Sequence, residues 1–475
     1  MKKIAIIGGG VIGAMTAREL SRYELDVTVL EKEADVAMGA TRANSAIVHA
    51  GFDAKEGSMK AKMNVAGSSM MEQVCKDLGV KYVRNGSLVI GFNDEDRAEL
   101  EKLCTRGIAN RVEGVRMIER TELKALEPNI SSNATCALYA PTGAIVCPYE
   151  LCIASMGNAM DNGAKLILDF EVTAIDRTES GFVITSSDGQ SVSADYVINA
   201  AGIYSDKIAK LVGDNSFDVH PRRGEYVLLD RECGGTITHT IFRTPSKMGK
   251  GILVTPTVDG NLLTGPTSVD MEDKEDKSTT VQGLTKLMGE ACENIDGGVP
   301  YGKSITSFCG LRAVGSTGDF IINENARFVN VAGIESPGIS SAPAIALYVR
   351  ELLKNAGLEL TSKDNFNPIR EPKHYFREAS IEEKNEIIAR DPAYGRIICR
   401  CETISEGEIL DAIRSNPPAR DIDGVKRRTR AGMGRCQGGF CGPYVMELIA
   451  KERGIEFDKV TKAGGISTMV IGKTK

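Results

Sequence analysis

The stretch Lys3–Gly13, KIAIIGGGVIG, decides the fold of the N-terminal half of this chain. Its first five residues form a short, mostly apolar run of the kind found in buried parallel strands. A G-x-G-x-x-G pattern follows and leads into a helical pattern that continues to Leu20. The first glycine permits a tight turn, the second lets backbone approach a pyrophosphate, and the third lets helix pack on strand. We therefore predict a dinucleotide-binding loop made of Gly8, Gly10, Val11, Ile12 and Gly13.

A second strand-like run, Asp26–Leu30, ends at Glu31. An acidic residue at this place can accept hydrogen bonds from the ribose hydroxyls of an adenosine. A glycine-rich turn without a ligand is the alternative, and the complete series of strand, helix, strand and acid disfavours it. The pattern predicts a bound dinucleotide but does not distinguish FAD from NAD.

Composition limits the remaining possibilities. The chain has 475 residues, which predicts two to four domains. Its net charge of −6 provides no excess of basic residues for phosphates, so we expect no nucleic-acid binding. No run of apolar residues is long enough to span a bilayer, and we expect a cytoplasmic protein. In that compartment the 12 cysteines are expected to be thiols or metal ligands.

The stretch Gly39–Gly51, GATRANSAIVHAG, carries the first family resemblance. It is similar to the segment that follows the second strand in the D-amino-acid oxidase superfamily, which includes glycerol-3-phosphate and L-2-hydroxyglutarate dehydrogenases. The resemblance implies FAD as the cofactor. It further implies that Thr41, Asn44 and Ser45 make polar contacts with FAD and that His49 approaches the flavin ring.

Three later segments fit the same superfamily, so the resemblance covers residues 1 to about 355. Residues 169–172 resemble the strand that meets the adenine through Val172, and residues 197–202 resemble a second glycine turn at Ala201 and Gly202. Residues 328–342 resemble the last strand and turn. There the resemblance places backbone amides of a helix N-terminus at the flavin pyrimidine, where they stabilise negative charge. These amides belong to Gly338, Ile339 and Ser340.

The fold class that follows is α/β, with a discontinuous Rossmann-like FAD-binding domain and an inserted substrate domain. Alternating apolar residues in the second insertion predict an antiparallel sheet over the flavin face. The FAD-binding pieces are expected at 1–75, 145–215 and 305–355, and the substrate domain at 76–144 and 216–304.

Two residues are candidates for catalysis. Oxidation of an alcohol requires a base, and His49 is the best candidate, although it could also be a structural neighbour of the ring. Arg312 matches a G-L-R-P turn of the family, with Ala313 in place of proline, and the resemblance implies that it holds the substrate's anion. A surface arginine is the alternative. Arg243 and Lys250 could add positive charge or remain solvated.

The end of the chain contains four clustered cysteines, after a polar segment at 356–395 that we interpret as a linker. Four thiolates can bind zinc or an iron–sulfur cluster, and a C-x-C pair fits a structural zinc ribbon less well than C-x2-C. Basic residues nearby would offset the charge of such a cluster and raise its potential. The thiols are Cys399, Cys401, Cys436 and Cys441, and the basic residues are Arg427, Arg428, Arg430 and Arg435.

This tail resembles the bacterioferritin-associated-ferredoxin type of [2Fe-2S] domain, through AGMGRCQG at residues 431–438. The resemblance is greatest to the version fused to catalytic subunits of anaerobic glycerol-3-phosphate dehydrogenases. It implies a small helical [2Fe-2S] domain at 396–455, with a helix near 405–415, and a C-terminal tail at 456–475. The cluster would give flavin electrons an exit to an electron-accepting partner, through which any membrane association would also run.

The expected function is an FAD-dependent dehydrogenase of a small anionic secondary alcohol, first sn-glycerol 3-phosphate. L-2-hydroxyglutarate or another 2-hydroxy acid, and a proline-type amino acid, are the alternative substrates. Residues 51–53 lack the arginine that aerobic glycerol-3-phosphate dehydrogenases carry there, and residues 57–62 resemble the L-2-hydroxyglutarate branch. The tail favours glycerol 3-phosphate. A non-catalytic electron-transfer or assembly subunit is an alternative from another class.

Overall fold

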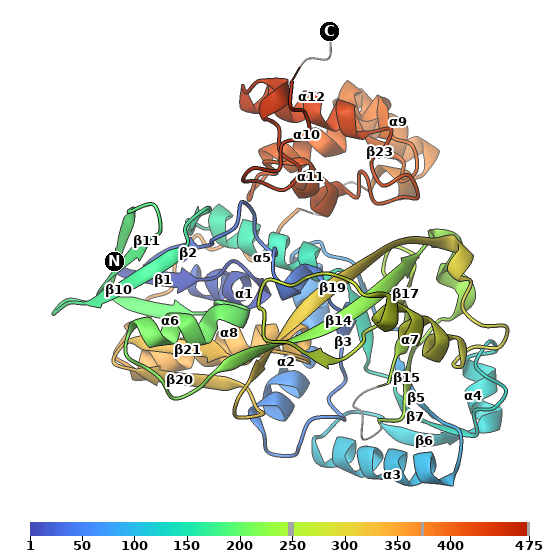
Figure 1. The fold of residues 1–475 in the computed structure, drawn as a ribbon. Coiled ribbons are helices and arrows are strands. Elements are labelled where there is room, and N and C mark those ends of the chain that lie inside the picture. The colour runs from blue at the N-terminus through green and yellow to red at the C-terminus, as the bar shows by residue number, and fades with distance from the viewer. Residues whose placement is uncertain (246–250, 372–374, 473–475) are drawn as a thin grey trace.

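The computed structural model describes residues 1–245, 251–371 and 375–472. Its N-terminal domain is built on a six-stranded sheet with the order β20-β21-β13-β1-β2-β9 (Figure 1). Five strands are parallel, and the edge strand β20 runs antiparallel to β21. The strands are β1 (Lys2–Ile7), β2 (Leu25–Leu30), β9 (Lys165–Ile167), β13 (Tyr196–Asn199), β20 (Ile321–Asn325) and β21 (Phe328–Ala332).

Both faces of this sheet are covered, which explains why β1 is apolar at consecutive positions. Ile4 and Ile6 pack with helices on one face of the sheet. Ala5 and Ile7 pack on the other face, against the small sheet of β10, β11 and β12. The helices are α1 (Val11–Leu20), α2 (Met59–Asp77), α5 (Pro148–Asp161), α6 (Ser205–Leu211) and α8 (Gly338–Asn355). The small sheet consists of β10 (Val172–Arg177), β11 (Phe182–Ser186) and β12 (Ser191–Ala194).

The second domain contains a nine-stranded sheet with the order β18-β14-β17-β16-β15-β5-β7-β6, and β19 also pairs with β14. The long strands β14 and β19 pair antiparallel and run beside the first domain (Figure 1). The strands are β5 (Ser87–Gly91), β6 (Arg116–Glu119), β7 (Cys136–Ala140), β14 (Val219–Leu229), β15 (Thr240–Arg243), β16 (Leu253–Pro256), β17 (Leu262–Gly265), β18 (Val269–Asp270) and β19 (Ser304–Gly315). Its helices are α3 (Asp94–Ala109), α4 (Arg120–Leu126) and α7 (Val281–Cys292). A further small sheet consists of β3 (Ile47–Val48), β8 (Ala144–Val146) and β4 (Tyr82–Val83), in that order.

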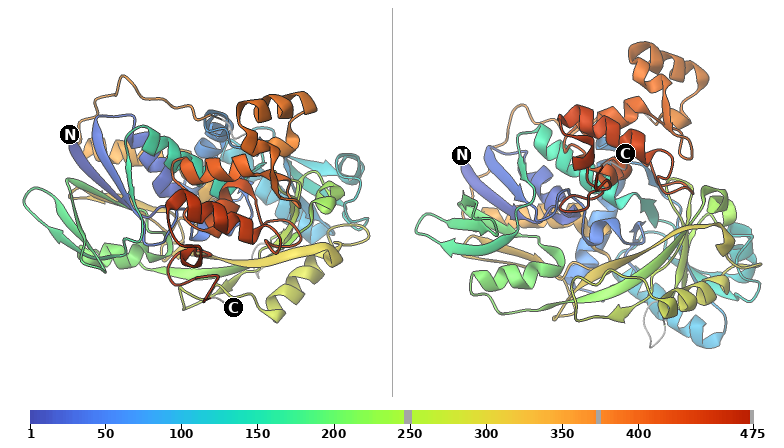
Figure 2. Two further views of the ribbon diagram at one scale, coloured as in Figure 1. Left: turned by 90° about the horizontal axis from the view of Figure 1, so that it is seen from above. Right: turned by 45° about the horizontal axis from the view of Figure 1, so that its top comes forward.

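The C-terminal residues form a separate small lobe on top of the body (Figures 1 and 2). Two of its helices begin with a capping box, Ser380 with Glu383 and Ser405 with Glu408, which satisfies the first amides of each helix. Its core is apolar and includes Ile409, Val425 and Ile449. The elements are α9 (Ile381–Arg390), β22 (Ile397–Cys399), β23 (Ile404–Ser405), α10 (Glu406–Arg414), α11 (Ile422–Thr429) and α12 (Gly442–Arg453).

The fold class predicted from the sequence is confirmed, with one difference in the second sheet. The sheet is not wholly antiparallel, because β5 and β15 pair in parallel. These strands come from the two separate insertions, so the sequence pattern of either one gives no information on their relative direction. The domain limits given above stay predictions. None of the helices among the described residues is long and apolar enough to cross a membrane.

Candidate active site and thiol centre

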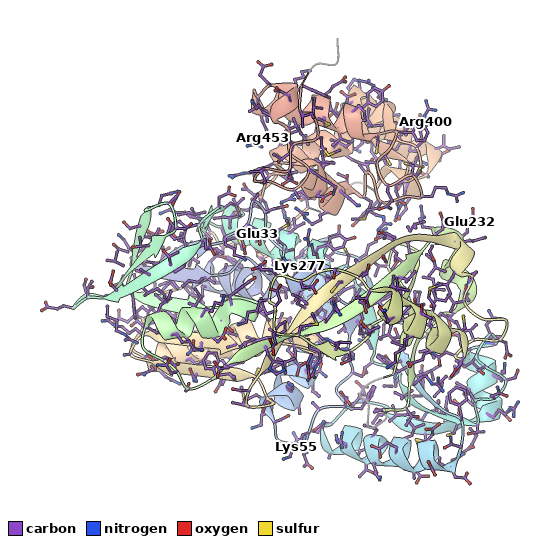
Figure 3. The ribbon with its side chains drawn as sticks, in the orientation of Figure 1. Glu33, Lys55, Glu232, Lys277, Arg400 and Arg453 are labelled. Atoms are coloured by element: carbon purple, nitrogen blue, oxygen red, sulfur yellow. The ribbon has the colours of Figure 1, made fainter. Side chains whose placement is uncertain are left out.

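A cavity of about 1160 Å³ lies along the contact between the two sheets. Glu33 and Lys277 line it toward the C-terminal lobe, and Lys55 lines it on the opposite side of the body (Figure 3). His49 and Arg312, the two predicted catalytic residues, line the same cavity. Of the predicted FAD contacts, it is lined by Gly8, Gly10, Val11, Ile12, Glu31, Thr41, Asn44, Ser45, Val172, Ala201, Gly202, Gly338 and Ile339. The cavity does not reach Gly13 or Ser340.

The glycine loop leaves no room for side chains where it turns from β1 into α1. Gly8 has a φ of 112°, and a Cβ on it would lie 2.4 Å from the carbonyl oxygen of Ala200. A Cβ on Gly13 would lie 2.0 Å from the carbonyl oxygen of Gly8. Gly13 is therefore required for packing between strand and helix, which explains why it does not face the cavity.

The N-terminus of α1 opens into the cavity. Gly10 is its N-cap and provides no side-chain cap, and the backbone amide of Val11 donates to Thr41 Oγ1 at 3.1 Å. Free amides and the positive end of the helix dipole form a site for phosphate groups. Thr41 therefore lies where a pyrophosphate would meet α1.

Glu31 is fixed at the end of β2 by backbone amides. Its Oε2 accepts from the amide of Gly9 at 2.6 Å, and its Oε1 accepts from the amide of Glu33 at 3.0 Å. Burial raises the pKa of Glu31 to about 7 despite these amides. The carboxylate is held at the cavity wall, where it can accept hydrogen bonds from the hydroxyl groups of a ribose.

Asn44 and Ser45 differ in how they meet the cavity. The Asn44 amide donates to the carbonyl oxygens of Ala40 and Thr41, at 3.1 and 2.8 Å, and its Oδ1 accepts from the amide of Ala46. Asn44 thus stabilises the turn that contains it. The Ser45 hydroxyl lies 3.4 Å from the hydroxyl of Tyr226, a cavity residue that sequence reasoning missed.

His49 is held by the N-terminal turn of α8. Its backbone amide donates to Ser340 Oγ at 2.7 Å, and Ser336 Oγ lies 3.4 Å from its Nε2. The His49 ring also lies beside the ring of Phe242, with centroids 5.8 Å apart. The Ser340 side chain thus positions the segment that carries His49, and the contact of its backbone amide with FAD stays a prediction.

Arg312 lies on β19 and is anchored by carbonyl oxygens. Its Nη2 donates to the carbonyls of Thr267 at 2.7 Å and Arg223 at 3.3 Å, and its Nε donates to that of Arg222 at 3.5 Å. These bonds use one edge of the guanidinium group and fix its plane. Arg312 is therefore a preorganised cation at the cavity, not a surface arginine.

Of the two further cationic residues considered from the sequence, one lies outside this cavity. Arg243 forms an ion pair with Glu293 and is not a lining residue. Lys250 lies outside the described residues. Lys55 and Lys60, which sequence reasoning missed as cavity residues, do line it, and Lys60 Nζ pairs with Glu335 at 2.7 Å. Their only sequence signal is that they follow His49 closely.

The four C-terminal thiols lie in the lobe as two pairs. Cys401 Sγ donates to Cys436 Sγ at 3.5 Å, and the Cys441 thiol forms a hydrogen bond to Cys399 that lowers the pKa of Cys399. Backbone amides also point at these sulfurs, from Glu402 and Gly432 to Cys399 and from Gly438 and Phe440 to Cys436. Within the described part of the chain, no three His, Cys, Asp or Glu side chains converge as a ready-made metal site.

Residues 3–352 match the family described as FAD dependent oxidoreductase, and residues 397–451 match the BFD-like [2Fe-2S] binding domain. The first match covers well over half of the chain. The chain belongs to the FAD-dependent oxidoreductase family. FAD and a [2Fe-2S] cluster are its cofactors.

Three individual proteins show what this flavoprotein is similar to. Glycerol 3-phosphate dehydrogenase of Caloramator mitchellensis is 48% identical over 100% of this chain and 99% of its own length. The structure of L-alpha-glycerophosphate oxidase from Mycoplasma pneumoniae with FAD bound has a TM-score of 0.73 and 31% identity, covering 78% of this chain and 99% of that one. L-2-hydroxyglutarate dehydrogenase of Bos taurus is 32% identical over 56% of this chain and 60% of its own length.

The residues of this flavoprotein fit both cofactors. The glycine loop excludes side chains where a dinucleotide phosphate would approach backbone, and the cavity continues from there to His49 and Arg312. Four thiols with amides directed at their sulfurs provide the ligands and hydrogen bonds that an iron–sulfur cluster requires. The Cys399–Cys441 and Cys401–Cys436 pairs would supply these ligands.

The arginines near the thiols make ion pairs that the sequence did not indicate. Arg427 and Arg428 both pair with Asp35 of the FAD-binding domain, at 2.6 and 2.7 Å, and all three side chains are buried. Burial opposes the charge of Asp35, but the two guanidinium groups outweigh it and hold the pKa of Asp35 at about 2. Arg427 and Arg428 thus join the lobe to the body.

The other two arginines of the run also reach the body. Arg430 pairs with Asp259 at 2.7 Å and with Glu402 at 2.9 Å, and Arg435 pairs with Glu232 at 2.9 Å. These ion pairs link the run to carboxylates of the body and the lobe, and the expectation that the same side chains offset the charge of the cluster stays a prediction.

Proposed function

We propose that this flavoprotein oxidises sn-glycerol 3-phosphate to dihydroxyacetone phosphate and passes the electrons through its cluster to an electron-accepting partner. One observation carries the proposal: a single cavity joins the phosphate-binding loop, at Gly8 and Gly10–Ile12, to His49 and the anchored Arg312. The full-length similarity to a glycerol 3-phosphate dehydrogenase supports this substrate over the alternatives.

Arg312 would bind the phosphate group of the substrate. Its Nε and Nη2 are bonded to carbonyl oxygens, which leaves Nη1 for an anion. Lys55, an exposed lysine at the cavity, adds positive charge nearby. A fixed cation and a mobile cation together favour a dianionic phosphate over a neutral group.

His49 would accept the proton of the substrate's secondary hydroxyl. The bond from its amide to Ser340 and the contact with Ser336 hold its imidazole at the cavity. Bound FAD supplies the two-electron acceptor for the hydrogen on the same carbon. Removal of one proton by His49 and of one hydride then accounts for the conversion of the alcohol to a ketone.

The [2Fe-2S] cluster supplies one-electron chemistry, so each substrate molecule requires two transfers to the partner. We also propose a cytoplasmic location. All twelve cysteines lie within the described residues and are free thiols, as expected in a reducing compartment.

L-2-hydroxyglutarate is the second candidate substrate, because relatives that act on it match more than half of the chain. Anaerobic absorbance spectra distinguish the candidates. Glycerol 3-phosphate is expected to bleach the flavin band, whereas L-2-hydroxyglutarate and L-proline at the same concentration are expected to leave the band unchanged. Bleaching only by one of the latter two would overturn the proposed substrate.

A further inference from the structure

The two thiol pairs of the C-terminal lobe differ in exposure. Cys399 and Cys441 are 1% and 2% exposed and belong to the lobe's apolar core. Cys401 is exposed and Cys436 is half-buried. A cluster held by all four thiols would therefore have one edge in the protein interior and one edge at the surface.

Large apolar side chains lie at that surface edge. Phe440, between the ligands Cys436 and Cys441, is 79% exposed, and Tyr444 and Ile397 are 46% and 37% exposed. The Phe440 amide is directed at the Cys436 sulfur, so its side chain starts beside the exposed thiol pair. The guanidinium group of Arg396 lies 5.9 Å from the Tyr444 ring, which places β22 beside the start of α12.

The same edge is positively charged. The ligand-bearing segments 396–401 and 430–444 contain four arginines and no acidic residue. Arg430 and Arg435 are paired with the body, and Arg396 pairs with Glu406 of the lobe at 2.8 Å, whereas Arg400 is exposed and makes no ion pair or side-chain hydrogen bond to another of the described residues. Figure 3 places Arg400 at the outer edge of the lobe. We define the cluster-edge surface as Arg396, Ile397, Arg400, Phe440 and Tyr444.

Exposed aromatic and arginine side chains around a patch of this kind are typical of the central contacts of protein interfaces. The exposed cations favour an acidic partner, which they would attract over a distance and orient. The body covers the other side of the lobe through Asp35 and Asp259, so the cluster-edge surface remains accessible in the full chain.

We propose that the cluster-edge surface docks a one-electron carrier protein with an acidic rim around its redox centre. In each encounter the reduced cluster gives one electron to the oxidised carrier, and two encounters complete one catalytic cycle. The direction of this flow rests on the proposed function, but the docking surface does not depend on which substrate reduces the flavin.

The test uses the full-length holoprotein reduced with dithionite, so that no substrate is involved. Stopped-flow absorbance follows its oxidation by two probes, cytochrome b5 with an acidic haem edge and cytochrome c with a basic one. The variants are Arg400→Glu and Phe440→Ser. The matched controls are Lys451→Glu, about 13 Å from Gly442 along α12, and Ile466→Ser, a fully exposed residue whose loop lies against Ala34 of the body.

We expect Arg400→Glu to slow the reaction with cytochrome b5 about tenfold and to speed the reaction with cytochrome c. Phe440→Ser is expected to slow the reaction with cytochrome b5 by a similar factor while the cluster absorption is retained. Both control variants are expected to react with each cytochrome at the rate of the parent protein. Equal rates for parent and both variants would overturn the proposal. Loss of self-association in Phe440→Ser, without a change in either rate, would also overturn it, since a second copy would then be the occupant.

The proposed function is tested apart from this. If glycerol 3-phosphate fails to bleach the flavin while the dithionite experiment shows the expected charge dependence, the substrate is wrong and the docking surface stands. If glycerol 3-phosphate bleaches the flavin and the dithionite experiment shows no charge dependence, the substrate stands and the docking surface is wrong.

Discussion

The cavity of the body and the thiol centre of the lobe would hold their cofactors by opposite means. The cavity uses backbone and contiguous sequence, with glycines where any side chain would collide, and it is enclosed by two sheets. The thiol centre uses four side chains from two loops, and one of its thiol pairs lies at the surface. The first arrangement would hold the reacting carbon against fixed groups, whereas the second would give electrons a short path to the surface.

The difference teaches that the two regions can fail independently. A change at the thiols should stop electron export without touching the cavity, and a change in the cavity should stop substrate oxidation without touching the cluster. The join between them is a third element, which depends on buried charges rather than on either cofactor.

The largest expected effect is that of Cys401→Ala. Removal of one of four ligands should abolish cluster absorption and with it the reduction of protein acceptors, because no other cysteine lies in these loops. Substrate should still bleach the flavin at the parent rate. Visible spectra and acceptor assays measure both, and Cys292→Ala is the control that should keep the cluster. A Cys401→Ala protein with full cluster absorption would show that this thiol is not a ligand.

His49→Gln sharpens the comparison from the other side. Without the base, flavin bleaching by glycerol 3-phosphate should slow about 10²- to 10⁴-fold, while cluster absorption remains. Anaerobic stopped-flow spectroscopy measures the rate. His220→Gln replaces a half-exposed histidine of β14 and should leave it unchanged. A bleaching rate within twofold of the parent would limit His49 to a structural role.

Sequence predicted the contiguous features of these regions well. The run from Lys3 to Gly13 specifies strand, turn and helix within a few residues of one another, and Ser405 and Glu408 mark the start of α10 in the same local way. His49 and Arg312 were correctly expected at one cavity because family resemblance supplied the long-range arrangement that local pattern does not contain.

The arginine run makes contacts that the sequence did not indicate. Arg427 and Arg428 meet Asp35, which lies more than 390 residues earlier in the chain, and nothing near either partner indicates the pairing. The Ser340 hydroxyl likewise accepts from the His49 amide, 291 residues away. Contacts of this kind depend on how whole domains pack, so a local charge pattern does not reveal them.

Asp35→Asn tests the join between the regions. It leaves two buried guanidinium groups without their carboxylate, which should lower the free energy of unfolding by about 3–5 kcal/mol. Urea denaturation followed by circular dichroism measures the loss. Glu452→Gln, which removes an exposed pair with Arg414, should cost only about 0.2–1 kcal/mol. Equal costs for the two variants would contradict a join made by Asp35.

The same pair predicts a pH dependence. Because the pKa of Asp35 is lowered to about 2, its contribution to stability is present above the unfolded-state pKa of about 3.9 and is lost as the pH falls toward 2. The stability difference between the parent and Asp35→Asn should therefore shrink between about pH 4 and pH 2. A difference that stays constant over that range would show that the carboxylate charge does not stabilise the join.

The smallest expected effect is that of Gly13→Ala. Its Cβ would collide with the Gly8 carbonyl and push α1 from β1, at a cost of about 1–3 kcal/mol and with weaker FAD binding. Thermal unfolding and the flavin content of the purified protein measure the two effects. Gly289→Ala, in α7 and with no atom within 4 Å of the added Cβ, is the matched control. Normal flavin content in Gly13→Ala would contradict the packing role of Gly13.

The central claim is that one chain carries electrons from a buried cavity to a surface cluster. The most direct measurement is low-temperature EPR spectroscopy of the full-length holoprotein, frozen at intervals after anaerobic mixing with glycerol 3-phosphate. We predict bleaching of the flavin followed by the signal of a reduced [2Fe-2S] cluster, and bleaching alone in Cys401→Ala. A flavin that bleaches in the parent protein while its cluster stays oxidised at every time would contradict the claim.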